Sequence, residues 1–479
     1  MPIDLDRPLP LNPDAAEVAM LGKLQGNVLK GHGRHRTAHV LLRFDPEQSA
    51  SARAFLRALA ARITSADVQL RQARTVRAAR SARRAKPPTP VFLGCLLSNS
   101  GYHALGVPGS AIPSDPQFRA GMKARGSSLA DPEPGTWDKP YRGSVDAMVL
   151  IAGEPDKAGA KTCKQVEAAL AEVLAATPDA VEVLGIERGR AYLNGNGDGI
   201  EHFGYADGRS QPLLRESDIA REAANSDGIV RWNPAFPLKQ VLVPDPGAND
   251  PTAFGSYFVY RKLEQHVRAF HKAEKDLGRK LHRLNTRFDP ELAGAMMVGR
   301  FEDGAPVLLQ DGAGMHNPLP NDFDYSGDMN GLKCPFHAHI RKANPRGDTA
   351  RLFGVPLDQE RAHIMARRGI TYGDRKQNKK GEFTDAPSRG AGLLFMAFQA
   401  DIGNQFEFTQ RSWVNNEDFV HPETGIDPLI GQGTGRGQVA RAGWGDSQAK
   451  KITVRFAGFV TLKGGEYFFA PSIPFLRTL

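Results

Sequence analysis

The order of strand-like and helix-like segments in the first half of the chain constrains the fold more than any other feature of the sequence. Residues 38–44, A-H-V-L-L-R-F, have the composition of a strand, and an amphipathic helix follows them. Two apolar runs of strand length come next, at residues 91–97 and 145–152, and a second amphipathic helix leads to a strand at 181–187. This order, β-α-β-β-α-β, predicts the split unit of a ferredoxin-like fold.

A similar order restarts in the second half of the chain. Residues 254–263, F-G-S-Y-F-V-Y-R-K-L, predict a strand that runs into an amphipathic helix, and residues 392–400 predict a strongly apolar strand. Near the end, residues 452–460 and 466–470 form a candidate hairpin across K-G-G. The repeated order predicts a second unit of the same plan.

We therefore predict an α+β protein made of two ferredoxin-like (βαββαβ) domains with antiparallel sheets. The domains are residues 1–235 and 236–479, and the turn-rich sequence W-N-P-A-F-P marks their junction. An irregular insert from about residue 300 to 390 is rich in Gly, Asp, Asn, Pro and Arg. Loops of that length in a compact domain are usually functional or disordered, and this insert carries C-P-F-H-A-H, so we interpret it as functional.

Composition and the N-terminal sequence narrow the class of protein. A run of about 18 apolar residues, which a membrane span needs, is absent from the sequence. The acidic, Pro-rich N-terminus lacks the apolar core of a secretory or twin-arginine leader, so we expect a cytoplasmic protein. The three cysteines are far apart and odd in number, which argues against a disulfide framework and against a zinc–thiolate site.

The formal net charge of +9 admits nucleic acid as a partner, but the charge is concentrated in one segment. Residues 71–86, R-Q-A-R-T-V-R-A-A-R-S-A-R-R-A-K, contain much of it and no aromatic side chain that would stack on a base. An exposed loop or helix with solvated charge is therefore the favoured interpretation, and a nucleic-acid-binding protein is the alternative.

Residues 194–212, N-G-N-G-D-G-I-E-H-F-G-Y-A-D-G-R-S-Q-P, carry the first candidate chemistry. Their start is similar to a calcium loop, but Tyr205 stands where an EF-hand requires a bidentate Glu, so calcium is not favoured. Asp207 lies in G-Y-A-D-G, and taken alone it indicates an Asx-type turn, the usual role of an Asp-Gly pair.

Two further motifs lie in the irregular insert. His337 and His339 flank one Ala, and on a strand their side chains would share a face. One neutral imidazole is a sufficient axial ligand for haem iron, whereas zinc would need a third ligand at suitable spacing, which we do not find. Two hydrogen-bonded or surface histidines are the alternative. Residues 366–373, A-R-R-G-I-T-Y-G, place paired arginines before a turn, where a guanidinium can be held in a fixed position.

Taken in order, G-x-x-D-G, H-I-R-K-A-N-P-R, R-R-G-I-T-Y-G and L-L-F-M-x-F-Q-A-D resemble the motifs of the dye-decolourising peroxidase family. The resemblance spans roughly residues 190–415. It implies two ferredoxin-like domains and a b-type haem, held in the C-terminal domain between a proximal histidine and a distal Asp and Arg. The sequence departs from the family at Thr371, where Pro is common, and this should alter the local turn more than the chemistry.

Residue by residue, the resemblance implies that His339, directly before I-R, is the proximal ligand of the haem iron. His337 is then a neighbour that does not bind the iron. Asp207 and Arg367 match the distal pair. Asp207 would move the peroxide proton as base and then as acid, and Arg367 would hold Asp207 and stabilise negative charge on the peroxide.

The resemblance also implies roles for surrounding residues. Leu393 and Phe395 would wall the distal pocket, and Arg341 would reach a haem propionate. His339 would donate its other ring N–H to a carboxylate, which raises its basicity as a ligand. Candidates for that carboxylate lie between Glu407 and Asp427 and include Glu417 and Glu423. Trp413 is a candidate for relaying electrons, and a partly buried structural Trp is the favoured alternative.

The implied activity is that of a haem peroxidase that reduces hydrogen peroxide and oxidises dyes, phenols or similar small aromatic reductants. A haem-handling protein of the same superfamily that releases iron is the alternative, although a carrier has no need of the proton shuttle that Asp207 and Arg367 would form. The sequence leaves the physiological reductant and the oligomeric state open.

Overall fold

Two four-stranded antiparallel sheets form the centre of the structure, and both belong to one ten-stranded sheet. The computed structural model describes residues 2–85, 87–157, 160–225, 228–314, 319–433 and 435–479. The strand order is β7-β8-β14-β2-β3-β1-β4-β10-β11-β9, and β8 pairs with β11 as well as with β14. The strands from β8 round to β11 therefore close into a barrel.

The first sheet has the order β2-β3-β1-β4, and helices connect β1 to β2 and β3 to β4. The predicted β-α-β-β-α-β order is therefore confirmed. Its elements are β1 (Arg36–Phe44), α2 (Ser49–Ala60), α3 (Ala66–Ser81), β2 (Phe92–Ser98), β3 (Ala147–Gly153), α8 (Lys164–Ala175) and β4 (Val181–Arg190). Between β2 and β3 the chain forms the short helices α4 (Asn99–Ala104), α5 (Pro116–Ala120), α6 (Met122–Leu129) and α7 (Lys139–Arg142).

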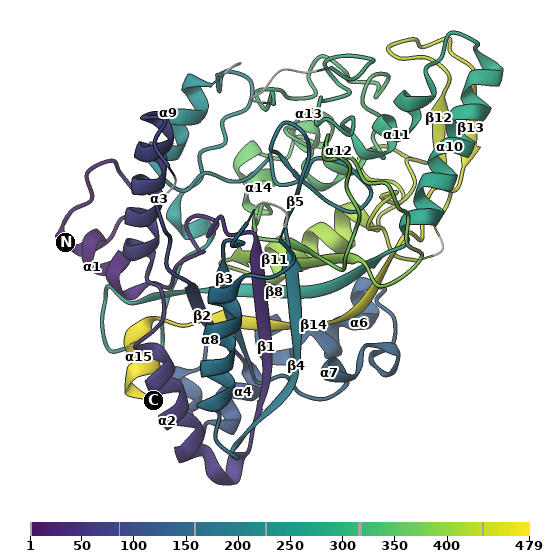
Figure 1. Ribbon diagram of the computed structural model, residues 1–479. Helices are drawn as coiled ribbons and strands as arrows, with labels where there is room; N and C mark the ends of the chain where they lie inside the picture. Colours follow the sequence, from purple (N-terminus) through teal and green to yellow (C-terminus); the bar gives the residue numbers. More distant parts are fainter. Residues whose placement is uncertain (1, 86, 158–159, 226–227, 315–318, 434) are drawn as a thin grey trace.

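The second sheet repeats this plan, because its order β14-β8-β11-β10 again places the first strand between the fourth and the third. Its elements are β8 (Phe254–Gln265), α10 (Val267–Leu284), α11 (Pro290–Val298), β10 (Ile370–Tyr372), β11 (Gly392–Gln399) and β14 (Val460–Ala470), with β9 (Ala366–Arg367) beside β11. Figure 1 shows β1 and β4 running across the direction of β8, β11 and β14. The α+β class and the ferredoxin-like plan are thus as predicted, and the boundary after residue 235 stays a prediction.

The prediction of a hairpin at the end of the chain is wrong. Residues 460–470 form one strand, β14, which continues through K-G-G with a register shift between Leu462 and Gly464. The ring of Tyr141 packs where a Cβ on Gly464 would lie, so this glycine permits a bulge rather than a turn. The preceding strand β13 (Lys451–Val454) pairs instead with β12 (Gln438–Arg441).

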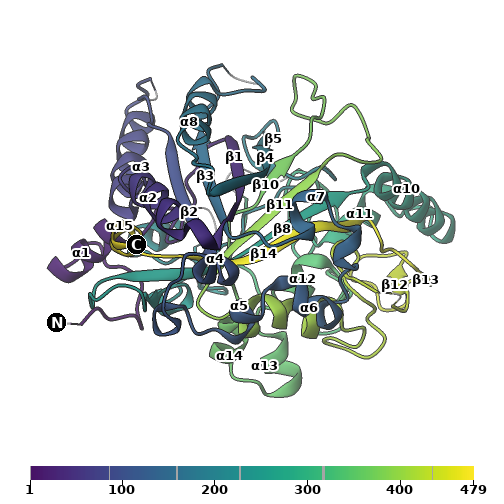
Figure 2. The same ribbon diagram turned by 90° about the horizontal axis from the view of Figure 1, so that it is seen from below.

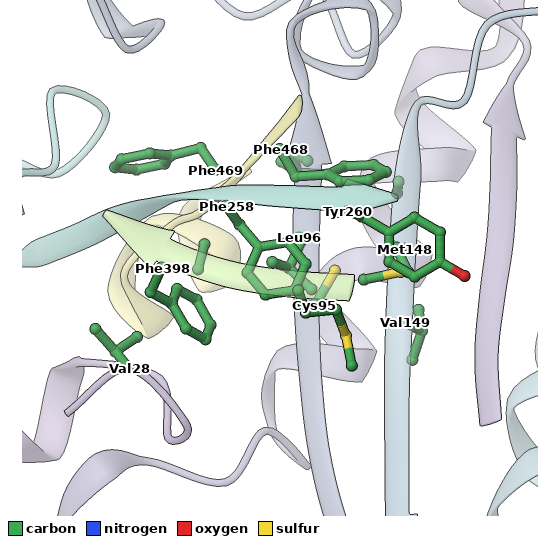
Figure 3. Close-up of a cluster of buried hydrophobic side chains, with 14 of the residues drawn as sticks. Val28, Cys95, Leu96, Met148, Val149, Phe258, Tyr260, Phe398, Phe468 and Phe469 are labelled. Carbon is green, nitrogen blue, oxygen red and sulfur yellow. The ribbon is translucent and has the colours of Figure 1, made fainter. Parts of the chain in front are cut away.

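The barrel encloses an apolar core to which both sheets contribute. Figure 3 shows Phe258 and Tyr260 of β8 and Phe398 of β11 near Leu96 of β2 and Met148 of β3. Every residue of β2 and β3 is buried, because the core covers one face and the helices of the first unit cover the other. The two sheets join through few backbone pairs, Phe468 with Ser98 and Phe469 with Leu97 at one seam and Tyr372 with Gly189 at the other. Side-chain packing across the core therefore holds them together.

The helices gather on two sides of the barrel. Figure 2 shows α2, α3 and α8 gathered on one side and α10, α11 and α12 on the other. The irregular insert contains α12 (His339–Ala343), α13 (Asp348–Phe353) and α14 (Leu357–Ala362). The other elements are α1 (Ala15–Lys23), β5 (Tyr192–Leu193), β6 (Gly199–Ile200), α9 (Glu216–Ala224), β7 (Val243–Pro244) and α15 (Ile473–Thr478).

The basic segment continues helix α3 and ends in an irregular stretch. Arg71, Arg74 and Arg80 are exposed on the helix, as the solvated interpretation requires, and Lys86 lies outside the described residues. Among the helices of the described ranges, none combines the length and the apolar character of a membrane span.

Gly189→Ala tests the seam between the two sheets. A Cβ at this position would overlap the Thr37 hydroxyl and the Ile370 side chain, and overpacking of this kind costs about 1–3 kcal/mol. The matched control is Gly22→Ala in helix α1, where a Cβ meets no atom within 4 Å and helix propensity favours Ala by roughly 0.5–1 kcal/mol. We expect urea denaturation to show a loss of stability for Gly189→Ala only, and equal free energies of unfolding for the two variants would contradict the close approach.

Candidate active site

One cavity brings together most of the residues that the sequence motifs single out. Strand β8 contributes Arg261 and Leu263, and strand β11 contributes Leu393 and Phe395, which the resemblance expected in a wall of the pocket. The remaining wall includes the segment 201–210, the end of α11, helix α12, Arg367 and residues near 430. The cavity therefore lies where the irregular insert meets the second sheet.

His339 opens into this cavity and is held by a buried carboxylate. Its Nδ1–H donates to Oδ2 of Asp427 at 2.8 Å, and Oδ1 of Asp427 accepts the N–H groups of Leu429 and Ile430 at 2.8 and 2.9 Å. Burial alone would raise the pKa of Asp427, but the His339 ring and the two N–H groups hold this pKa below its usual value. The same pairing outweighs burial and raises the pKa of His339. Nε2 is thus the ring nitrogen left for a ligand in the cavity.

Asp427 is the carboxylate that supports His339. It lies at the end of the predicted range, whereas Glu417 and Glu423, the two residues named within that range, do not have this role. Glu417 accepts a hydrogen bond from Nε of Arg436 at 2.7 Å, and Glu423 is exposed. Sequence spacing could not select Asp427, because the choice depends on how the 415–430 loop packs against α12.

His337 lies close to His339 in sequence but plays no part in the cavity wall. Its side chain is buried, and burial lowers the pKa of His337 to about 3, so the ring is neutral. Its Nε2 has no hydrogen-bond partner in the described structure. The two histidines therefore separate as the resemblance implied, with His339 alone at the cavity.

Asp207 and Arg367 meet across the cavity wall. Nη1 of Arg367 donates to Oδ1 of Asp207 at 3.1 Å, and the same oxygen accepts the N–H of Gly208 at 2.6 Å. Arg367 is fixed by strand β9 and by its backbone N–H, which donates to Oε1 of Gln211 at 3.0 Å. Oδ2 of Asp207 accepts no hydrogen bond within the described part of the chain, so it is available to a ligand.

The expectation that Arg341 reaches into the site is wrong. Its guanidinium is buried away from the cavity, where Nε donates to Asp348 at 2.7 Å and Nη1 donates to Asp328 at 3.0 Å. His339 begins helix α12 rather than lying on a strand. At about 100° per residue, the side chain two positions after His339 points to the opposite side of the helix.

Two arginines other than Arg341 reach the cavity. Arg300 and Arg346 line the cavity, and both donate to Oγ of Ser210, at 3.4 and 3.0 Å. Neither forms an ion pair with a carboxylate of the described residues, and burial lowers the pKa of Arg300 to about 9 and that of Arg346 to about 10. Arg346 ends the motif H-I-R-K-A-N-P-R, so the motif contained a signal for it, whereas Arg300 had none.

Trp413 is buried, and one aromatic ring, that of His363, lies between it and the cavity. It packs against Phe419 with ring centroids 5.4 Å apart and against His363, which lines the cavity, at 5.2 Å. The burial fits the structural interpretation of this Trp, and an electron-relay role stays a prediction.

The loop whose start is similar to a calcium loop forms a turn instead. Oδ1 of Asn194 accepts the N–H groups of Asn196 and Asp198, which makes it the centre of an Asx-type turn. A different group, His271, Glu274 and Glu302, places ligand atoms within 4.8 Å of one another on the far side of the 201–207 loop.

Comparisons with known proteins agree with this architecture. The family described as "DyP dimeric alpha+beta barrel domain" matches residues 23–181. The "Multifunctional dye peroxidase DyP2" of an Amycolatopsis species is 45% identical over 488 aligned residues, covering 100% of both chains. "Dye-decolorizing peroxidase msp1" of Mycetinis scorodonius is 34% identical and covers 80% of this chain and 75% of its own.

Solved structures agree as well. The structure of DyP2 from Amycolatopsis superposes with a TM-score of 0.90 at 44% identity and covers 100% of both chains. A DyP-type peroxidase from an Anabaena species superposes with a TM-score of 0.87 at 39% identity and covers 100% of this chain and 97% of its own.

A barrel of two ferredoxin-like sheets with a histidine, an aspartate and an arginine around one cavity is the architecture of a peroxidase, an oxidoreductase. Identity over the full length then places the chain in a particular family. It belongs to the dye-decolourising peroxidases.

Arg341→Leu tests the corrected position of Arg341. The substitution leaves Asp328 and Asp348 buried without their common cation, and removing one partner of a buried ion pair costs about 3–5 kcal/mol. Arg411→Leu, at an exposed position, is the control and should stay within about 0.5 kcal/mol of the parent. Urea denaturation measures both, and an unchanged midpoint for Arg341→Leu would contradict the structural role.

Proposed function

We propose that the protein is a haem peroxidase that reduces hydrogen peroxide and oxidises dyes, phenols or similar small aromatic reductants. The observation that carries the proposal is one cavity that holds both the His339–Asp427 pair and the Asp207–Arg367 pair. The names of the relatives support the substrate class, since DyP2 is called a multifunctional dye peroxidase. A further structural relative, 26% identical with a TM-score of 0.73, is a dye-decolorizing peroxidase in complex with 2,6-dimethoxyphenol.

The residues of the cavity fit a b-type haem. His339 presents Nε2 to the cavity while Asp427 accepts its Nδ1–H and orients the ring, the usual arrangement of a metal-binding histidine. Apolar side chains suited to a porphyrin face line the same space, among them Val298, Leu393 and Phe395. Arg300 and Arg346 supply buried positive charge without a carboxylate partner among the described residues, which suits two propionates. We place the group in the C-terminal half, which provides most of the wall.

The bound haem iron would supply the redox chemistry of peroxide reduction. Oδ2 of Asp207 is the free basic atom, and it would take a proton from one peroxide oxygen and return it to the other, which leaves as water. Arg367 would hold Asp207 in place through Oδ1 and stabilise negative charge on the peroxide. Two reductant molecules, each giving up one electron and one proton, complete the reduction of peroxide to two waters.

Asp427 would act through His339. Its carboxylate accepts the Nδ1–H and is itself held by two backbone N–H groups, so the ring cannot rotate and its Nε2 keeps its electron density. The distal pair also favours a peroxidase over an iron-releasing haem protein, because a carrier has no use for a fixed acid–base group beside an arginine.

His339→Ala tests the proposed ligand. We expect the variant to lose the haem Soret band after purification and reconstitution, because no other described histidine of the cavity wall is held by a carboxylate in this way. His337→Ala is the matched control, because His337 lies two positions away, is buried and is not part of the cavity wall, and it should keep the band. Equal loss in both variants would contradict the assignment.

Arg367→Leu tests the distal pair. We expect a fall of about 10²–10³ in the rate constant for reaction with hydrogen peroxide, the usual effect of removing a donor that stabilises developing negative charge. The Soret band should be retained, since Arg367 does not hold the group. Arg368→Leu is a poor control because Arg368 binds the carbonyls of Asn27 and Val28, so exposed Arg411→Leu serves instead. Stopped-flow rates equal to the parent would exclude Arg367 from the reaction.

A further inference from the structure

A second carboxylate, Glu201, lies in the same cavity and has no part in the mechanism above. Its Oε2 accepts the N–H of Phe203 at 2.8 Å and an N–H of the Gln265 amide, and its Oε1 accepts the N–H of Tyr205 at 3.1 Å. The residue lines the cavity together with Asp207. Three donors on one half-buried carboxyl indicate a role in holding the surrounding loop.

That loop carries Asp207. The backbone N–H of Glu201 donates to the carbonyl of Tyr205 at 3.1 Å, and the N–H of Asp207 donates to the carbonyl of Gly199 at 2.9 Å. Gly204, with φ of 102°, makes the reversal between them. The Glu201 side chain fills the inside of this reversal, so the position of Asp207 depends on it.

Glu201 forms no ion pair with any cation of the described residues. The negative charge of Asp207, on the same loop, adds to the raising of the pKa of Glu201. The Tyr205 phenol also faces it but donates to Glu274, and Gln265 approaches from β8. Arg261, His339 and Arg367 face the same cavity from the other elements. Burial, with Asp207 adding to it, raises the pKa of Glu201 to about 7 against the three hydrogen bonds.

Gln265 can provide a hydrogen-bond acceptor for a protonated Glu201 carboxyl. Its Oε1 is buried and has no hydrogen-bond partner, while its Nε2 donates to Glu201. Rotation of the amide by half a turn exchanges these two atoms. A protonated Glu201 would then donate its O–H to Oε1, so the site can hold Glu201 with or without the proton.

We propose that Glu201 is a positioning residue for Asp207, and that loss of its proton impairs the distal site. In the protonated form it fixes the loop without adding charge. In the ionised form it places a second negative charge beside Asp207, where the peroxide must itself become negative, and the two charges repel. The proposal rests on the proposed peroxidase function and adds a residue to it.

Three variants test the proposal by the pH dependence of kcat/KM for hydrogen peroxide in the haem-loaded protein. In the parent protein we expect a fall above about pH 7, approaching tenfold for each further pH unit. Glu201→Gln imitates the neutral form and should remove this fall. Glu201→Ala removes the hydrogen bonds and should lower kcat/KM by about 10²-fold at every pH, the effect of misplacing a catalytic group.

Glu302→Gln is the matched control. The pKa of Glu302 is raised to about 7 as well, with the charge of Glu274 among the causes, yet Glu302 is exposed and lies outside the cavity. This variant should keep the fall at high pH. A fall that survives in Glu201→Gln, or that disappears in Glu302→Gln, would overturn the role given to ionised Glu201, and full activity in Glu201→Ala would overturn the positioning role.

Infrared spectroscopy gives a readout that does not depend on turnover. The difference spectrum between acidic and alkaline buffer should contain carboxylic-acid C=O intensity that titrates near neutral pH, of which one part is lost in Glu201→Gln and a separate part in Glu302→Gln. If Glu201→Gln lost none of this intensity, the inference would be overturned. A parent protein that binds haem but does not react with peroxide would overturn the proposed function instead, so the two failures are distinguishable.

Discussion

The pairing of strand β8 with both β14 and β11 is the constraint on which the rest of the structure depends. It closes the barrel, and it also gives one strand two different faces. Because side chains alternate along a strand, Phe258 and Tyr260 pack into the core while Arg261 and Leu263 line the cavity. The apolar core and the cavity therefore lie on opposite faces of strand β8. A change in the register of β8 would exchange these faces and lose both.

Buried charges hold the irregular insert in place, in addition to an apolar core that it shares with helices α10 and α11. Arg341 joins Asp328 and Asp348, and Nζ of Lys342 donates to the carbonyls of Asn416 and Phe419 at 2.7 and 2.8 Å. Buried charges are costly unless each finds several partners, which these do. The result is that α12 is tied on one side to the start of the insert and on the other to the loop leading to Asp427. His339 and Asp427 are thus rigid relative to each other although 88 residues separate them.

The sequence predicted the parts of the fold whose periodicity is local. Alternation and helical stripes identified β1 to β4 and their helices, and the repeat in the second half was visible in β8 and β11. Prediction from the sequence failed where the structure depends on contacts between residues that are far apart in the chain. The K-G-G stretch reads as a turn, but Tyr141 turns it into a bulge of β14. The resemblance placed Arg341 at the cofactor, but helix α12 turns its side chain away from His339 toward Asp328 and Asp348. Arg300, outside every motif, could be found only from the cavity.

Segment 201–210 makes the cavity depend on both halves of the chain. It comes from the first half, yet it gives the cavity Asp207, Glu201 and the Ser210 hydroxyl. Each of these accepts hydrogen bonds from residues of the second half: Asp207 from Arg367, Glu201 from Gln265, and Ser210 from both Arg300 and Arg346. The buried arginines lose a neutral acceptor if the segment is displaced, and unpaired buried charge is strongly unfavourable. Asp207, Glu201 and Ser210 therefore keep their positions in the cavity only through contacts between the two halves of the chain.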